Sequence, residues 1–204
     1  MWNKVRNNIC SGWSICTNNS VAEGGRIWLL WNPGSFAVDI LDVSPQSIHS
    51  RITMRGNQQV FYFTVVYGFN RAAERGTLWT SLKGYYNAVQ GSWLVGGDFN
   101  NIIHPNERLG GAPVSLADIK PFQDCLHQCD LYDIKAIGSI FTWNNKQKLD
   151  TLVYSRLDRC VSNSDWVINF HESYAYFMPE GTFDHCPCII YLQGKPSARK
   201  QSFK

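Results

Sequence analysis

Hydrophobic residues in the first third of the chain lie in four short runs, and turn residues separate these runs. The runs are Arg26–Trp31, Phe36–Val43, Ser47–Met54 and Gln59–Phe69. Short runs rich in β-branched and aromatic residues, bounded by Gly, Pro, Asn and Ser, predict β-strands. The fourth run is almost continuously apolar, which is typical of a strand that is buried on both faces of a sheet.

The spacing of the hydrophobic residues then changes to that of helices. They recur every three or four positions at Leu78, Trp79, Leu82, Tyr85, Tyr86 and Val89. This period predicts an amphipathic helix that ends before Gly91. A second helix is predicted over Ser115–Cys129, because Ser115 and Asp118 have the spacing of an N-terminal capping box. Its buried face is expected to consist of Leu116, Ile119, Phe122, Leu126 and Cys129.

Shorter apolar segments after Gly91 predict the remaining strands. They are Ser92–Asp98, Ser139–Trp143, Leu152–Val161, Ser173–Phe177 and His185–Leu192, with a turn capped by Asn163 or Ser164 before the fourth of them. Strands that are apolar on both sides need layers over both faces of their sheet. We therefore predict an α/β fold of two packed β-sheets with helices outside. No linker divides the chain, which predicts one domain over residues 1–194 and a basic tail over 195–204.

The composition excludes two classes of protein and leaves the partner open. Of the 204 residues, 44% are hydrophobic, which excludes a disordered chain. The apolar stretches are far shorter than the ~20 residues that cross a bilayer, so no membrane association is expected. The net charge of +3 is compatible with a polyanionic partner but does not point to one by itself. The basic residues Lys195, Arg199, Lys200 and Lys204 predict a solvated tail.

The cysteines indicate a reducing compartment. There are seven of them, and no apolar segment of a secretory signal follows Met1. An odd number of cysteines without a signal predicts free thiols, so we expect a nuclear or cytoplasmic protein that is not secreted.

Two pairs of polar residues stand at predicted strand ends, where loops position functional groups. Asp98 and Asn100 are two residues apart and therefore project to the same side of the chain. The same two residues also suit a simple turn that ends the strand. Asp184 and His185 are neighbours in a predicted loop, where they form either an acid–base or metal pair or a structural contact.

Two further candidates lie in or at the end of predicted strands. Asp158 stands between Arg156 and Arg159 in an apolar run, where a buried carboxylate needs a partner. Either arginine suits an ion pair with it. Tyr67 and Asn70 close the fourth apolar run, where a tyrosine belongs either to the core or to a site at the rim of the sheet.

The order of these segments resembles the endonuclease/exonuclease/phosphatase superfamily of metal-dependent phosphodiesterases. The resemblance runs from about Trp28 to Leu192. The individual motifs most resemble those of the endonuclease domain of plant non-LTR (LINE) retrotransposons. The motifs that carry this resemblance are Gly24-Gly25-Arg26-Ile27-Trp28, Gly96-Gly97-Asp98-Phe99-Asn100, Asn106-Glu107-Arg108, Phe141-Thr142-Trp143 and Ser155-Arg156-Leu157-Asp158-Arg159. It implies a four-layer α/β sandwich of two mixed sheets flanked by helices, with DNA as the substrate.

The resemblance also implies a role for the residues that would face water and phosphate. Asp98 looks like the carboxylate that positions or deprotonates the attacking water. Asn100 resembles the amide that orients the phosphate and this water. Tyr67 is similar to a phenol that contacts the phosphate, and Asn70 matches an asparagine at the same rim.

The remaining candidates resemble the metal-side and acid–base residues of the superfamily. Asp184 looks like a metal-side carboxylate, and His185 resembles the histidine that contacts the phosphate or transfers a proton. Asp158 is similar to the acid that orients this histidine and favours its charged form. The metal implied is Mg²⁺ or Mn²⁺, which would neutralise oxygen charge in the reaction.

The chain departs from the pattern of this superfamily at its start. The superfamily opens with a strand that ends in an asparagine and a second strand that ends in a metal-binding glutamate. Glu23 is the one acid among the first thirty residues here, and it lies in a loop before Gly24. We therefore expect an N-terminally truncated monomeric domain that lacks these first strands, leaves a sheet edge unpaired and binds the metal weakly if at all.

The departure leaves three interpretations open. The first is a weakened or inactive DNA endonuclease. The second is a remnant that binds nucleic acid through Lys and Arg without cleaving it. The third is a phosphoesterase of the same superfamily that acts on a small molecule.

Overall fold

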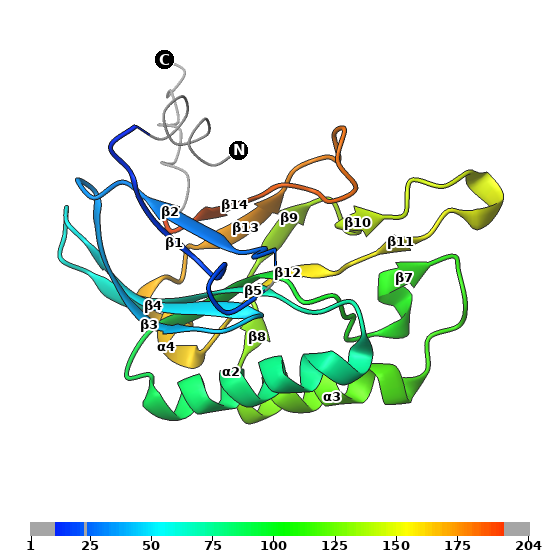
Figure 1. Cartoon of the computed structure of the whole chain (residues 1–204), viewed down its shortest axis with the longest axis horizontal. Helices are drawn as coiled ribbons and strands as arrows, with labels where there is room; N and C mark the ends of the chain where they lie inside the picture. Colours follow the sequence, from blue (N-terminus) through cyan, green and yellow to red (C-terminus); the bar gives the residue numbers. More distant parts are fainter. Residues whose placement is uncertain (1–10, 23, 194–204) are drawn as a thin grey trace, which may run out of the picture.

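The computed structural model describes residues 11–22 and 24–193. Glu23 and the predicted basic tail lie outside the described residues. No helix among the described residues is long and apolar enough to cross a membrane. The elements build one α/β body in which sheets and helices lie in layers (Figure 1).

A six-stranded mixed sheet forms the centre of the molecule. Its strands, in spatial order, are β3 (Phe36–Val43), β4 (Ser47–Met54), β5 (Val60–Tyr67), β6 (Trp93–Asp98), β12 (Asp158–Ser162) and β8 (Tyr132–Asp133). β5 and β6 pair in parallel, and the other neighbours pair antiparallel. The predicted strand β5 contributes to the core on both faces, since Val66 packs toward the helices and Phe61 toward the opposite layer.

Two long helices cover one face of this sheet (Figure 1). They are α2 (Gly76–Ala88), which follows the 3₁₀ turn η1 (Ala72–Arg75), and α3 (Leu116–Gln128). The predicted capping box is confirmed, because the Ser115 hydroxyl accepts the N–H of Asp118, whose carboxylate accepts the N–H of Ser115. The rings of Trp79 and Phe122 stack between the helices, with their centroids 4.7 Å apart. Leu116 was expected to be buried, but it is 72% exposed because it starts the helix outside this contact.

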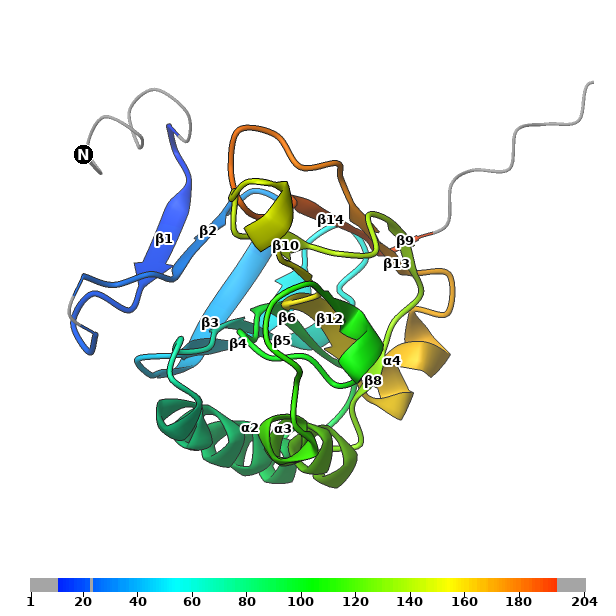
Figure 2. The same ribbon diagram turned by 90° about the vertical axis from the view of Figure 1, so that its right-hand side faces the viewer.

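A second layer of strands covers the other face of the central sheet (Figures 1 and 2). β13 (Tyr174–Phe177) lies between β9 (Ala136–Gly138) and β14 (Cys188–Tyr191), and β1 (Ser14–Thr17) pairs with β2 (Trp28–Trp31) in a separate hairpin. The helix α4 (Ser164–Asn169), capped by Asn163 as predicted, places Trp166 in the core between the layers. The predicted α/β arrangement of packed mixed sheets and helices is thus confirmed.

An apolar cleft of about 260 Å³ separates the hairpin from β14. Leu29 and Leu30 of β2 and Ile190 of β14 line it, together with Phe61 and Phe63 of the central sheet. Among the described residues, β2 pairs with β1 alone and β14 with β13 alone. Each of these strands therefore has one edge without a strand partner in the described part of the chain.

The run Leu152–Val161 was expected to be one strand, and this prediction is wrong. It divides into β11 (Tyr154–Ser155) and β12, because the amides of Leu157 and Asp158 donate to the hydroxyl of Thr142 instead of a neighbouring strand (3.0 and 2.9 Å). β11 belongs to a small sheet with β7 (Arg108–Leu109) and β10 (Trp143–Asn144). The 3₁₀ turns η2 (Pro105–Glu107) and η3 (Leu149–Thr151) lie next to β7 and β11 along the chain.

The predicted strand Ser139–Trp143 is also wrong, since β9 ends before it and β10 begins at its last residue. His185 joins Trp143 through an isolated bridge, and β14 begins only at Cys188. The loop that carries Asp184 and His185 is therefore held against the start of β10.

Candidate functional site

Three predicted residues lie side by side at one end of the central sheet. In the strand register, Tyr67 of β5 pairs with Asp98 of β6, and Asp98 pairs with Asp158 of β12. They come from three neighbouring strands, so residues almost a hundred positions apart form one row. Their strands are rich in large apolar residues, which hold this end of the sheet in the core.

Gly97 allows the close approach of β5 and β6 at this row. Its φ is +138°, and a Cβ atom built on it would lie 2.2 Å from the carbonyl oxygen of Val66. Only glycine fits a backbone contact this close. Gly97 therefore sets the spacing of β5 and β6 beside Tyr67 and Asp98.

Asp98 and Asn100 are held by mutual hydrogen bonds just beyond the end of β6. Asp98 Oδ1 accepts the backbone N–H of Asn100 at 2.8 Å, and Oδ2 accepts its side-chain amide at 3.0 Å. The same amide donates to Gly68 O at 2.7 Å and lies 3.3 Å from Asn70 Oδ1. The predicted turn and the predicted cluster are therefore the same structure, in which the amide of Asn100 binds both Asp98 and Asn70.

His185 connects the two aspartates of the row. Its Nδ1 lies 2.9 Å from Asp158 Oδ2, and its Nε2 lies 3.9 Å from Asp98 Oδ2. The alternative ion pair of Asp158 with a flanking arginine is wrong. Arg156 and Arg159 instead face Glu107 and Asp133.

The surroundings of the site raise the pKa of two of its groups, Asp98 and His185. Burial raises the pKa of Asp98 to about 6, and the nearby charge of Asp158 adds to the shift. Burial lowers the pKa of His185, but the hydrogen bond and charge of Asp158, with the charges of Asp98 and Asp184, outweigh it and raise the pKa overall. Asp98 is therefore a carboxylate above about pH 6, and His185 keeps its proton to a higher pH than a free histidine, which suits acid–base chemistry.

Tyr67 and Asp184 each bind a residue outside this cluster. The hydroxyl of Tyr67 accepts a hydrogen bond from Arg26, whose guanidinium carbon lies 5.1 Å from the centre of the Tyr67 ring. Asp184 is exposed and accepts the indole N–H of Trp143 at 3.2 Å. Asp184 therefore acts on His185 through its charge, while its carboxylate binds Trp143 of β10.

Two residues that support the site were missed by the sequence analysis. Arg75 is 7% exposed and donates to the carbonyl oxygens of Phe69 and Asn70 (3.1 and 3.0 Å), and its charge favours ionised Asp98. Thr142 positions Asp158 by accepting its backbone N–H. No local pattern marks Arg75, whereas Thr142 stands in the motif Phe141-Thr142-Trp143, which could have pointed to it.

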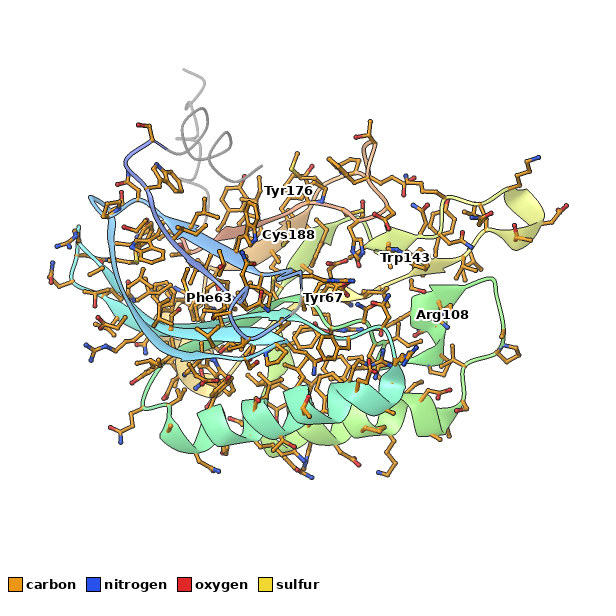
Figure 3. The ribbon with its side chains drawn as sticks, in the orientation of Figure 1. Phe63, Tyr67, Arg108, Trp143, Tyr176 and Cys188 are labelled. Atoms are coloured by element: carbon orange, nitrogen blue, oxygen red, sulfur yellow. The ribbon has the colours of Figure 1, made fainter. Side chains whose placement is uncertain are left out.

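A polar cavity of about 450 Å³ opens beside the cluster. Asn70 and Asn100 line it on the side of the row, and Arg75, Arg108 and Trp143 line it elsewhere. Figure 3 shows Arg108 and Trp143 on the side of the small β7–β11–β10 sheet, with Tyr67 at the end of the central sheet. Asp118 also lines the cavity, so it offers two cations and one carboxylate next to the amides.

The described residues do not form a metal site from protein ligands alone. Among residues 11–22 and 24–193, no three His, Cys, Asp or Glu side chains converge as a metal ion requires. Asp184, the predicted metal-side carboxylate, is engaged with Trp143. The residues present therefore do not fit a Mg²⁺ ion held by the protein alone.

Comparison with known proteins places the fold. No protein-family model and no curated protein matches the sequence. Among solved structures, the chain is similar to the endonuclease domain of TRAS1, a telomere-specific non-LTR retrotransposon, with a TM-score of 0.66 and 13% identity over 89% of this chain and 80% of that one. An endonuclease/exonuclease/phosphatase family protein from Bacteroides thetaiotaomicron gives a TM-score of 0.55 and 13% identity over 92% and 78% of the two chains.

The chain has the endonuclease/exonuclease/phosphatase fold. The mannosyl-6-phosphatase of Bacteroides thetaiotaomicron shares it as well, with a TM-score of 0.55 and 12% identity over 93% of this chain and 79% of that one. These identities are low, so the similarity concerns the fold, and the chemistry follows from the side chains at the site.

Proposed function

We propose that this chain hydrolyses phosphodiester bonds in DNA and derives from the endonuclease of a plant LINE-type retrotransposon. One observation carries the proposal: His185 lies between Asp158 and Asp98, beside the amides of Asn100 and Asn70. The likeness to the TRAS1 endonuclease domain supports this choice of substrate. We further propose that the chain acts as a monomer in the nucleus or cytoplasm, a reducing compartment that suits the free thiols of its described cysteines.

Asp98 is the general base in this proposal. With a pKa of about 6, it is ionised at neutral pH and close enough to neutrality to take a proton from water. The oxygen of that water attacks phosphorus, and the bond from phosphorus to the leaving oxygen breaks. Asn100 fixes the carboxylate through two hydrogen bonds, which keeps one orientation ready for the water.

His185 supplies positive charge and a proton close to Asp98, since its Nε2 lies 3.9 Å from Asp98 Oδ2. Asp158 accepts from Nδ1, so Nε2 is the nitrogen that faces the substrate. The raised pKa of His185 favours the imidazolium, which stabilises negative charge that develops on the phosphoryl oxygens. Asp158 is a positioning residue, because it acts through this histidine.

The phosphate itself is held by neutral and cationic donors around the row. Asn70, Asn100 and Tyr67 offer amide and hydroxyl groups at the end of the sheet. Arg26 lies over Tyr67, and Arg75 lies below Asn70, so both add positive charge near these donors. Charged donors bind phosphate about twice as strongly as neutral ones.

We also propose that Mg²⁺ or Mn²⁺ binds weakly and only together with the substrate. Magnesium commonly uses one or two carboxylates and takes its other ligands from phosphate and water. Asp98 and Asp184 are carboxylates whose charges act on His185, but no set of three ligands exists among the described residues. The metal is therefore expected to raise the rate without being bound tightly in the absence of DNA.

A nicking assay on supercoiled plasmid tests the proposal. Purified chain is incubated with Mg²⁺ or Mn²⁺, with and without EDTA, and compared with Asp98→Asn and His185→Ala. Each substitution is expected to reduce the nicking rate by about 10²–10⁴-fold, the usual contribution of a general acid or base. His127→Ala is the matched control, since His127 lies on α3 in a different cavity.

The same assay separates the proposal from its alternatives. Robust nicking that neither substitution reduces would overturn the site. DNA binding that weakens steeply with salt, without cleavage by any variant, would favour the binding remnant. Turnover of a sugar phosphate but not of DNA would favour the small-molecule phosphoesterase, for which the likeness to a mannosyl-6-phosphatase is the specific observation.

A further inference from the structure

Two cysteine sulfurs meet between the sheets, outside the proposed catalytic cluster. Cys160 Sγ and Cys188 Sγ lie 3.8 Å apart. Cys160 is buried in β12 of the central sheet, and Cys188 is exposed at the start of β14 in the second layer. Figure 3 shows Cys188 beside Tyr176 of the adjacent strand β13. The contact therefore joins two sheets and two segments that are 28 residues apart in sequence.

We propose that Cys160 and Cys188 are a modification site, a dithiol that closes reversibly to an inter-sheet disulfide. A disulfide needs sulfurs about 2.05 Å apart at the end of two short side chains. The two sulfurs, which are 3.8 Å apart, must approach by about 1.8 Å to form this bond. Both are free thiols in the structure.

The exposure of the two thiols sets the order of the reaction with a small disulfide such as oxidised glutathione. The exposed Cys188 attacks one sulfur of the oxidant as its thiolate, forms a mixed disulfide and releases the first reduced thiol. Cys160 then attacks the Cys188 sulfur, which closes the protein disulfide and releases the second. The two protons lost by the cysteines are carried by the two released thiols, and the oxidant takes up two electrons.

The electrostatics of the pair agree with this order. The hydrogen bond from Cys160 lowers the pKa of the Cys188 thiol, and the same hydrogen bond together with burial raises the pKa of Cys160. The thiolate, which is the attacking species, therefore forms on the exposed member.

The bridge would join the two segments that carry the Asp158–His185 pair. Cys160 stands two residues after Asp158, and Cys188 stands three residues after His185. A disulfide between Cys160 and Cys188 would fix β14 to β12 close in sequence to that hydrogen bond. Oxidation is therefore expected to stabilise the chain, because the link restricts the unfolded chain more than the folded one.

Peptide mapping of the whole chain tests the proposal. After treatment with oxidised glutathione, the expected product is an intact protein lighter by two hydrogens and a linked peptide pair containing Cys160 and Cys188. The melting temperature is expected to rise by roughly 5–10 °C, and dithiothreitol is expected to reverse both changes. Cys160→Ser and Cys188→Ser should each abolish the disulfide. The control Cys186→Ser, two residues before Cys188, should retain it.

Other products would overturn the proposal. Two such products are a stable mixed disulfide on Cys188 that does not go on to the Cys160–Cys188 disulfide, and a disulfide that involves another cysteine. The absence of any reaction of the folded protein would overturn the proposal as well. If a serine variant fails to fold, mapping of the wild-type linked peptide and the Cys186→Ser control still decides the outcome. None of these readouts requires nuclease activity, so the inference and the proposed function fail separately.

Discussion

At the scale of single residues, Asp98 combines a functional position with a cost in stability. It is 8% exposed, and burial raises its pKa to about 6. The folded state therefore holds its proton to a higher pH than the unfolded state, whose carboxyl titrates near 4. Stability from this group is present below pH 4 and is lost as the pH rises through 6. His185, whose pKa is also raised, adds a loss at higher pH.

Asp98→Asn is expected to stabilise the metal-free protein at pH 8. The variant removes a buried charge and keeps an Oδ1 acceptor for the N–H of Asn100, although it loses the Oδ2 acceptor of the Asn100 side-chain amide. We expect the free energy of unfolding to rise by about 1–3 kcal/mol at pH 8, measured by urea denaturation with EDTA. The difference from wild type should shrink toward zero as the pH falls from 6 to 4. A difference that does not change with pH would show that burial of charge is not its cause.

At the scale of elements, the close pairing of β5 and β6 depends on one residue without a side chain. Gly97→Ala would place a Cβ atom 2.2 Å from Val66 O at a φ of +138°. The expected loss in the free energy of unfolding is at least ~2 kcal/mol, from strain and clash together. Urea denaturation measures it.

The matched control for this prediction is Gly84→Ala in the exposed part of α2. An alanine Cβ meets nothing within 4 Å there, so the substitution is expected to stabilise the protein by about 0.5–1 kcal/mol. Opposite signs for the two variants are the expected result. Equal effects would mean that the approach of β5 and β6 is not constrained as the structure shows.

Element boundaries were predictable where a local pattern determines them. The strands Phe36–Val43 and Ser47–Met54 have the predicted bounds, because turn residues flank apolar runs, and the capping box of α3 begins where predicted. The run Leu152–Val161 failed, because its break is made by Thr142, a residue distant in sequence that accepts two of its amides. Such a partner leaves no trace in the run itself.

At the scale of the whole molecule, a buried arginine holds three parts of the chain together. Arg159 of β12 is fully buried and pairs with Glu107 of η2 and with Asp133 of β8, the latter at 2.8 Å. A buried ion pair that loses one member leaves an uncompensated charge, whose desolvation is expensive. The position of β12, and with it Asp158, thus depends on this network.

Arg159→Met is expected to destabilise the protein by about 3–5 kcal/mol, measured by urea denaturation at pH 7. The matched control is Arg51→Met, which breaks an exposed pair with Asp39 and is expected to change stability by about 0–1 kcal/mol. A small effect at Arg159 would show that water or Arg156 compensates Glu107.

The sequence by itself determined the class of fold, most of the elements and the residue types at the site, because hydrophobic period, caps and strand-end polar pairs are local properties. Only the tertiary structure decided which of these residues meet. His185 lies next to both Asp98 and Asp158. Arg156 and Arg159 form ion pairs with Glu107 and Asp133, and Asp184 accepts a hydrogen bond from Trp143. The physical reason is that a carboxylate's partner and pKa depend on burial and on charges a few ångströms away in space, and strand pairing, not sequence distance, sets which charges those are.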